Sequence, residues 1–460
     1  MKGEDGMGQG MLHRLIDVLM DASRRLGMSC ECRELERVAV VIHRTMSYQS
    51  RQFHTMEHIF GFLDGAEAET VLAAVFHDLV YYQIDEGLPP DLSGFLSAYL
   101  RVDGQSIYLL EGREPDDVAY RLCLGIFGFS EGQKLDPYKG LNEFLSALCM
   151  AHLIGGHTSR EVVVAVAACI EASIPFRKSD VSGGPAEKLA SRLRSLAAEG
   201  LAALDDESIE RIVRRSVDFG NTDVKDFSLA DAGLFLSNTW KLLPESNAGL
   251  RRRGTFSISE YRVALQKTRA FFLGLDPASV YHSYGDHPDA ARMKKYADAS
   301  RRNLALADTY LRAKLLATAL LEAIARISGG DAPVALFMGD IPSEGTEAET
   351  LLGKLTTSTT PPWLDANNEV YRLLRDGRLE ESSFDLRNSP LALYLYDRLE
   401  PREWAARSHD SEAFFGGSME AGDFLSRFPP ALLADLIRGC AAMVPTRKKE
   451  LEAWLAGRST

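Results

Sequence analysis

The sequence predicts an all-α protein. Apolar residues recur at helical spacing along most of the chain, and alternating strand patterns are scarce. The segment VALFMGDI (334–341) is the best candidate for a strand. Apolar residues make up 45% of the chain and charged residues 25%, which excludes wholesale disorder and collagen-like repeats.

The expected helices begin near the N-terminus. Residues 11–26 place apolar side chains at i, i+3 and i+4 positions, the pattern of an amphipathic helix. Residues 68–83 (AETVLAAVFHDLVYYQ) are apolar on nearly all sides, which predicts a buried central helix. Further helices are expected over NEFLSALCMAHLIG, REVVVAVAACIEAS, PAEKLASRLRSLAAEGLAAL, DDESIERIVRRSV, ISEYRVALQKTRAFFLGL and the long stretch from DAARM to EAIARI.

A length of 460 residues predicts two or three domains, at about 150 residues each. The composition changes near residue 328, where SGGDAP and GTEAETLLGKLTTSTTPPW are rich in Gly, Thr and Pro, as linkers are. We therefore predict one domain over 1–328 and a second region over 329–460. The second region is mostly helical and its role is unknown, because it contains no motif with recognisable chemistry.

The chain is acidic, with 52 Lys and Arg against 65 Asp and Glu, a net charge of −13. A net negative field repels phosphate, so neither duplex nucleic acid nor an anionic membrane is an expected partner. No apolar stretch is long enough to span a bilayer, and the N-terminus lacks the order of a signal peptide. The six cysteines show neither a disulfide framework nor CxxC spacing. These observations predict a cytoplasmic protein.

The chemistry concentrates in RQFHTMEHIFGFLDG and the following AAVFHDLVYY. His54 and His58 are four residues apart and would share one face of a helix. His77 and Asp78 are adjacent within an apolar segment, where burying both is costly unless each finds a partner. A divalent cation accepts imidazole nitrogen and carboxylate oxygen together. A hydrogen-bonded core histidine is the ordinary alternative for each residue alone, but their combination in one short window favours a metal site.

The segments FHTMEHI and FHDLVY resemble the HD-domain superfamily of metal-dependent phosphohydrolases. They are especially similar to members with an aromatic-His-x-x-x-His segment, including the cyclic-nucleotide phosphodiesterases. The resemblance is specific between Arg51 and Asp85 and extends by helical pattern to about residue 240. It implies an HD-domain helical bundle within 1–328, followed by a mostly helical C-terminal extension.

The resemblance also implies residue roles. His58, His77 and Asp78 correspond to metal ligands of the family. His54 corresponds to the proton donor to the leaving oxygen in the phosphodiesterase branch, and Asp78 would also act at the catalytic centre, where it could bridge to a second cation.

The family has a further, distal Asp ligand on a later helix. Asp223, in an Asn-x-Asp-Val context, matches that segment best, although its separation from Asp78 is longer than in compact members. Asp218, Asp226 and Asp231 remain alternatives.

A second cation is an open alternative. His152 and His157 are candidate ligands for it, and Glu171 is a candidate for orienting a water. Arg177 and Lys178 are candidates for contacting substrate phosphate.

The expected function is metal-dependent hydrolysis of a phosphoester by a metal-activated water. The cofactor would be one or two divalent cations (Mn, Fe, Mg, Ni or Zn), since His and Asp ligands suit several metals. The substrate would be a phosphorylated small molecule, a nucleotide or a cyclic nucleotide, and the sequence does not indicate an oligomeric state. The alternative is a non-catalytic HD-fold regulatory or ligand-binding protein that acts through its C-terminal region. An Asp from the distal segment that reaches His77 would favour the enzyme.

Overall fold

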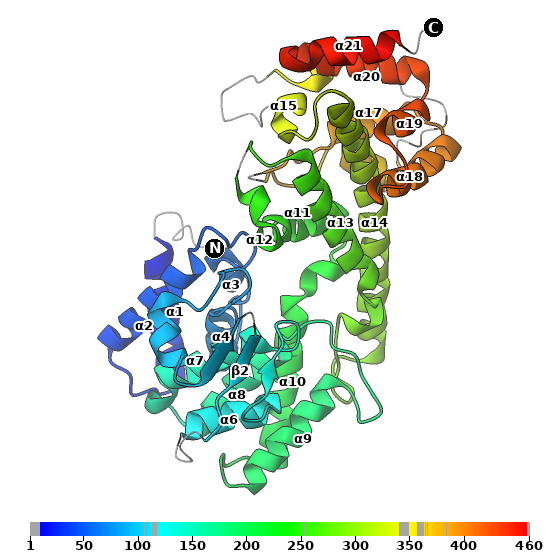
Figure 1. The fold of residues 1–460 in the computed structure, drawn as a ribbon. Coiled ribbons are helices and arrows are strands. Elements are labelled where there is room, and N and C mark those ends of the chain that lie inside the picture. Colours follow the sequence, from blue (N-terminus) through cyan, green and yellow to red (C-terminus); the bar gives the residue numbers. More distant parts are fainter. Residues whose placement is uncertain are drawn as a thin grey trace, which may run out of the picture. The chain divides into compact units, whose positions relative to one another are not determined.

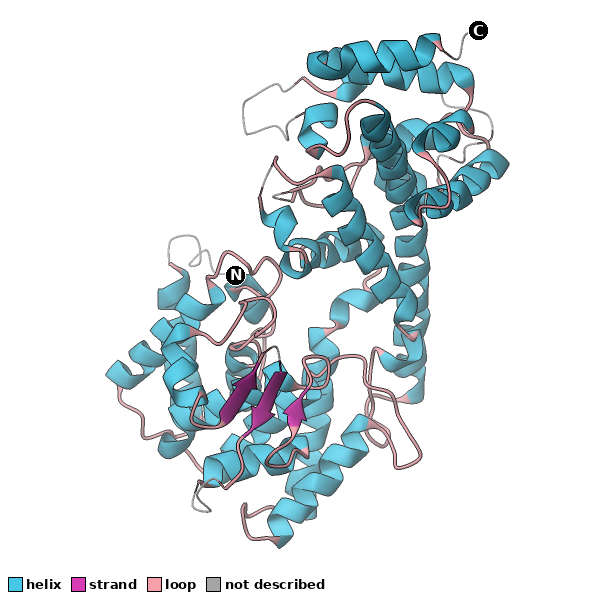
Figure 2. Ribbon diagram, viewed as in Figure 1, coloured by secondary structure: helices cyan, strands magenta, loops and turns pink. Residues whose placement is uncertain are grey.

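The computed structural model is predominantly α-helical, as predicted (Figures 1 and 2). It describes residues 10–104, 106–112, 117–252, 254–339, 349–356, 363, 365, 367–382 and 384–457. The chain forms two compact units: unit 1 comprises Met1–Ser228 and Asp276–Asp298, and unit 2 comprises Leu229–Leu275 and Ala299–Thr460. Among the described residues, no helix has both the length and the apolar character that crossing a bilayer requires.

Unit 1 is built around two apolar helices, α4 and α8. The α4 helix packs on α1, α7 and α8, and α8 packs on α6, α7, α9 and α10. Ser159 accepts a hydrogen bond from Val162 N at the start of α8, and Asp205 accepts one from Ser208 N at the start of α10. The helices are α1 Met11–Arg25, α2 Cys32–Met46, α3 Met56–Phe60, α4 Ala68–Phe76, α5 Pro90–Leu96, α6 Val118–Phe127, α7 Leu141–Ile154, α8 Arg160–Ala172, α9 Pro185–Ala198 and α10 Asp206–Asp223.

A small antiparallel sheet in unit 1 was not foreseen. Its order is β1-β2-β3, with β1 Leu100–Asp103, β2 Ser106–Leu109 and β3 Lys134–Leu135 (Figure 2). Leu100 pairs with Leu109, and Ile107 pairs with Leu135, so apolar side chains line one face. The strands are too short to show a clear alternating pattern in the sequence.

Unit 2 is also helical. Its elements are α11 Ala232–Trp240, α12 Leu242–Ser246, α13 Ile258–Gly274, the part of α14 Ala290–Ile327 from residue 299, α15 Val334–Met338, α16 Glu369–Arg375, α17 Pro390–Tyr396, α18 Pro401–Phe415, α19 Ala421–Ser426, α20 Pro430–Met443 and α21 Lys448–Ala456.

The predicted boundary near residue 328 falls inside unit 2. The Gly-rich segment there follows the end of α14, and hydrogen bonds join it to the segment at the start of α13 in the same unit. Ile258 N donates to Ala332 O at 2.9 Å, and Val334 N donates to Phe256 O at 3.1 Å. The composition change therefore marks a helix end.

The strand predicted over 334–341 is wrong, because residues Val334–Met338 form α15. Pro333 precedes the helix as its N-cap residue, and Phe337 is buried. A short apolar run does not distinguish a strand from a buried helical turn. Residues 340 and 341 lie outside the described residues.

The contact between α8 and α10 is close at Gly220. A Cβ atom on Gly220 would lie 2.5 Å from the carbonyl oxygen of Ala172. That oxygen is backbone and cannot move away without displacing α8. The close approach matters for the site below, because Asp223 lies one turn further along α10.

We expect Gly220→Ala to lower the free energy of unfolding by about 1–3 kcal/mol, because overpacking outweighs the helix propensity gained. Gly94→Ala is the matched control, since Gly94 is helical and a Cβ atom there would have no neighbouring atom within 4 Å. It should change stability by less than about 1 kcal/mol, in the stabilising direction. Urea denaturation measures both, and equal effects would contradict the close-packing argument.

Candidate metal centre

Three helices of unit 1 bring the candidate ligands together. His58 lies on α3, and His77 is the C-cap residue that follows α4. Asp78 follows in the turn, and Asp223 is the last residue of α10. Segments that lie far apart in the sequence therefore meet in one group.

The donor atoms lie close to one another. Nε2 of His58 is 3.2 Å from Oδ1 of Asp223 and 3.7 Å from Oδ2 of Asp78. Nε2 of His77 is 3.0 Å from Oδ2 of Asp78 and 3.7 Å from Oδ1 of Asp223. Donors that share one ion at about 2.1 Å lie roughly 3.0–3.4 Å apart at about 90–109°. Two of the four distances lie in this range and the other two, at 3.7 Å, exceed it slightly, so the four side chains come close to the spacing of a ligand set.

The hydrogen bonds of His77 fit the same interpretation. Its Nδ1 lies 2.8 Å from the carbonyl oxygen of Ala74, which can only accept, so Nδ1 donates the proton. Metal-binding histidines are typically oriented by this kind of bond from the other ring nitrogen. Nε2 of His77 and Oδ2 of Asp78 are buried and have no hydrogen-bond partner of good geometry. A divalent cation would satisfy both atoms, so the residues fit the group.

The charges of the site are strongly coupled. Burial acts to lower the pKa of His77, but the carboxylates of Asp78 and Asp223 outweigh it and hold the pKa well above its usual value. Burial acts to raise the pKa of Asp78, but the imidazoles of His77, His54 and His58 hold it below its usual range. The pKa of Asp223 is lowered to about 2, because hydrogen bonds from His58 and His77 overcome burial. Both carboxylates are thus charged and face the positive charge of the imidazoles.

The helix predicted over 68–83 ends earlier, at Phe76, because tertiary hydrogen bonds replace the helical ones. Arg51 Nη1 donates to the carbonyl oxygen of Asp78 at 2.6 Å. Val80 N donates to Oγ of Ser146 at 2.9 Å. The turn carrying Asp78 is therefore held from α7 and from the segment before α3.

Arg51 is itself fixed by a buried ion pair. Its guanidinium contacts both carboxylate oxygens of Asp85, at 3.0 Å from Nε and 2.6 Å from Nη2. The side chains are 0% and 1% exposed. The pair joins the two ends of the segment that carries His54, His58, His77 and Asp78, and its role was not predicted.

The expectation that His54 and His58 share one helical face is wrong. Helix α3 begins at Met56, so His54 lies before it, and only His58 is helical. The two imidazole rings are still neighbours, with centroids 6.0 Å apart. The ring of His54 packs edge-on against Tyr81 with a centroid distance of 4.4 Å. A half-buried imidazole thus stands beside the ligand group.

The other acidic candidates for the distal ligand have different surroundings. Asp218 is 58% exposed and contacts Nε2 of His287 at 2.8 Å. Asp231 caps α11 in unit 2 by accepting from Gly233 N and Leu234 N. Asp226 lies in the 3-10 helix η2 (Lys225–Ser228) and is not among the grouped donors. Asp223 is the acid that reaches the histidines.

Glu143 on α7 was not predicted from the sequence. Its Oε2 is buried and has no hydrogen-bond partner. Burial and the charges of Asp78 and Asp223 raise the pKa of its carboxyl to about 7. The sequence offered one signal for Glu143: it is an acid at the start of the otherwise apolar helical segment NEFLSALCM. That segment does not indicate that α7 faces the His77-Asp78 dipeptide.

The side chains considered for a second cation and for phosphate lie elsewhere. His152 stacks on Phe95 with a centroid distance of 3.8 Å. Glu171 is 1% exposed and pairs with Arg177 and Arg192, each at 2.5 Å, so it serves a buried ion pair. Arg177 is engaged in that pair as well.

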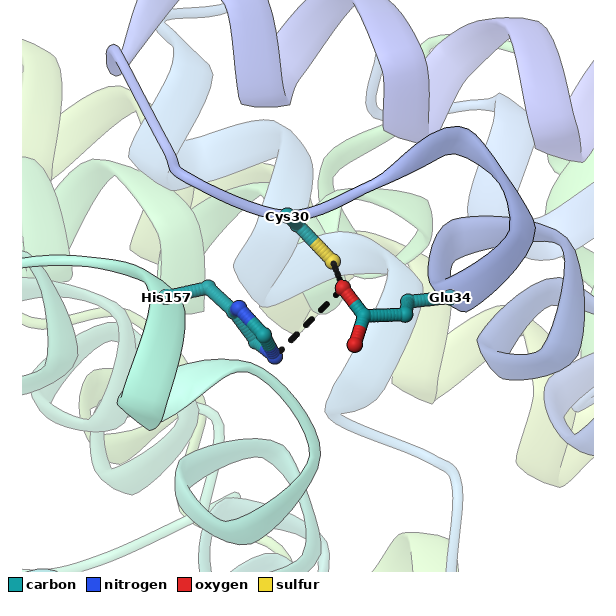
Figure 3. A group of neighbouring side chains, drawn as sticks. All are labelled: Cys30, Glu34 and His157. Atoms are coloured by element: carbon teal, nitrogen blue, oxygen red, sulfur yellow. Dashed lines mark hydrogen bonds and ion pairs between the residues drawn. The ribbon is translucent and has the colours of Figure 1, made fainter.

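His157 belongs to a different group, with Cys30 and Glu34 (Figure 3). Sγ of Cys30 lies 3.5 Å from Oε2 of Glu34, and Nε2 of His157 lies 3.8 Å from the same oxygen. That oxygen also accepts from Glu31 N at 2.9 Å and completes the capping box of α2. These contacts connect the start of α2 with the 3-10 helix η1 (Gly155–His157).

Comparison with protein-family models, with curated proteins and with solved structures finds no match to this chain.

The buried pair of Arg51 and Asp85 generates a stability prediction. We expect Asp85→Ala to cost about 3–5 kcal/mol of unfolding free energy, because it leaves a buried guanidinium without its counter-charge. Asp91→Ala is the control, since the Arg44–Asp91 pair has side chains 65% and 33% exposed and should contribute about 0–1 kcal/mol. Urea denaturation compares the two, and a loss below about 1 kcal/mol for Asp85→Ala would show that the pair does not hold the segment.

Proposed function

We propose that unit 1 is a metal-dependent phosphohydrolase. The observation that carries the proposal is the convergence of two imidazoles and two carboxylates, whose nearest donor atoms are 3.0–3.7 Å apart. Two of these atoms, Nε2 of His77 and Oδ2 of Asp78, are buried and have no hydrogen-bond partner. Asp223 comes within 3.7 Å of Nε2 of His77, so the ligand set includes a distal acid. A set lacking that acid would have favoured a non-catalytic module. The resemblance of the same residues to the HD-domain superfamily supports the proposal.

His58, His77, Asp78 and Asp223 would hold the cation. A divalent cation bound there supplies a nucleophilic water at neutral pH and polarises the phosphoryl oxygen. Bound by these residues, the cation would also offset the acidic character of the chain locally and so allow an anionic ester to approach.

His54 would donate a proton to the leaving oxygen. Its imidazole lies beside the ligand group without belonging to it, and Tyr81 and Phe53 pack against its ring. General acids of this kind accelerate ester cleavage when they lie within hydrogen-bond reach of the leaving atom.

Two further side chains would act on the reactants. Glu143 directs an unpartnered carboxylate oxygen into the same buried region and can accept a proton from the attacking water. Lys225 follows closely after Asp223, and its Nζ lies 3.2 Å from the carbonyl oxygen of Gly61, at the end of the helix that carries His58. Its charge would attract substrate phosphate.

The direct test replaces His77 and Asp78 with Ala together. The double variant should lose bound metal and phosphoesterase activity, because both a neutral donor and an anionic donor are removed. Metal content by elemental analysis and hydrolysis of a panel of phosphomonoesters, nucleotides and cyclic nucleotides measure the effect. Asp218→Ala, on α10 but outside the group, should retain both properties. Activity surviving in the double variant would refute the proposal.

His54→Ala separates proton donation from metal binding. We expect metal content to be unchanged and kcat to fall by about 10²–10⁴-fold for alkyl phosphates, whose leaving oxygen needs a proton. The loss should be much smaller for 4-nitrophenyl phosphate, whose leaving group departs as an anion. Equal losses on both substrates would contradict the role of His54.

A further inference from the structure

Unit 2 contains a cavity of about 310 Å³, formed by α13, α14, α15 and the segment that leads into α17. Most of its lining is apolar, including Phe256, Ile258, Leu321, Met338 and Leu391. The volume lies at the lower end of the range for small-molecule sites, about 300–1,000 Å³. All of the lining residues that the structure describes belong to unit 2.

One wall of the cavity is polar and belongs to a buried charge cluster. Lys314 lines the cavity, and its Nζ donates to Oδ2 of Asp385 at 2.8 Å and to Oγ of Ser389 at 3.2 Å. Oδ2 of Asp385 also accepts from Trp240 Nε1 at 3.1 Å and from Arg378 Nη1 at 3.4 Å. The side chains of Lys314 and Arg378 are 7% and 1% exposed.

The charges in this cluster do not balance. Among the described residues, Asp385 is the one carboxylate that contacts either Lys314 or Arg378. Two buried cations therefore share one anion. An uncompensated buried charge is costly, and a second anion would relieve that cost.

The hydroxyl of Tyr261 lies close to Asp385, next to the excess charge. The hydroxyl of Tyr261 lines the cavity, is buried and has no hydrogen-bond partner of good geometry. Burial and the charge of Asp385 raise the pKa of Tyr261 well above its usual value, so the hydroxyl stays protonated and can donate. The Lys314 ammonium, the Tyr261 hydroxyl and the Ser389 hydroxyl together offer donors to an incoming acceptor.

We propose that this cavity binds a small molecule with an apolar body and a single carboxylate. The carboxylate would contact Lys314 and Tyr261, and the apolar body would fill the space lined by Phe256, Leu321 and Met338. The site lies outside the metal centre and does not depend on its function. The proposal gives unit 2 a ligand-binding role of its own.

Isothermal titration calorimetry of the full chain tests the proposal with octanoate, 1-octanol and octylamine as probes. Octanoate should bind saturably at one site, and 1-octanol at least about tenfold more weakly, because the charge-assisted contact is lost. Hexanoate should bind more weakly than octanoate by about fourfold per methylene removed. Absence of saturable octanoate binding, or octanol or octylamine binding as tight as octanoate, would overturn the proposal.

Two variants locate the site. Lys314→Met leaves Arg378 and Asp385 as a balanced pair, so the unit should fold, and octanoate affinity should fall by at least about tenfold with little change for octanol. Ala317→Phe, on the cavity wall, should abolish binding of both probes. Lys241→Met is the matched control, since the Lys241 side chain is 38% exposed and does not line the cavity.

If both cavity variants fold and still bind octanoate as the unaltered chain does, the octanoate site lies outside this cavity and the proposal is overturned. If neither variant folds, as judged by circular dichroism, the comparison of probes on the unaltered chain decides.

Discussion

The structure of unit 1 depends on one constraint, a buried imidazole beside a buried carboxylate at the end of an apolar helix. Nε2 of His77 and Oδ2 of Asp78 are 3.0 Å apart and lack other hydrogen-bond partners. Each unsatisfied buried polar group costs about 1–3 kcal/mol, and more when charged. Two additional donors, from His58 and Asp223, face the same space. A divalent cation held among them would turn this unfavourable arrangement into a coordinated one.

The surrounding fold holds the four side chains in place. The turn after α4 is secured by Arg51 through backbone carbonyl oxygens, and Asp85 secures Arg51. The close approach of α8 and α10 at Gly220 places Asp223, and the bond from His77 Nδ1 to Ala74 aims the imidazole. Rigid support of this kind is what a preorganised metal site requires. Unit 2 contains an analogous unbalanced polar cluster, at Lys314 and Asp385, beside a cavity.

The sequence predicted the helical class, and the grouping of His58 and His77 with Asp223, because apolar periodicity and local motifs carry that information. It did not predict where α4 ends, since Arg51, Ser146 and Asn142 compete for the backbone groups only after tertiary folding. Glu143 was missed for the same reason, because its position beside Asp78 is set by the packing of α7. The boundary expected at residue 328 failed as a boundary because hydrogen bonds tie the Gly-rich segment to Phe256 and Ile258.

The most direct test of the central claim is an anomalous-difference Fourier map from crystals of the full chain soaked with Mn²⁺. We expect a peak within coordination distance of Nε2 of His58, Nε2 of His77 and the carboxylates of Asp78 and Asp223. A map with no peak among these four side chains, at a Mn²⁺ concentration that supports activity, would contradict it.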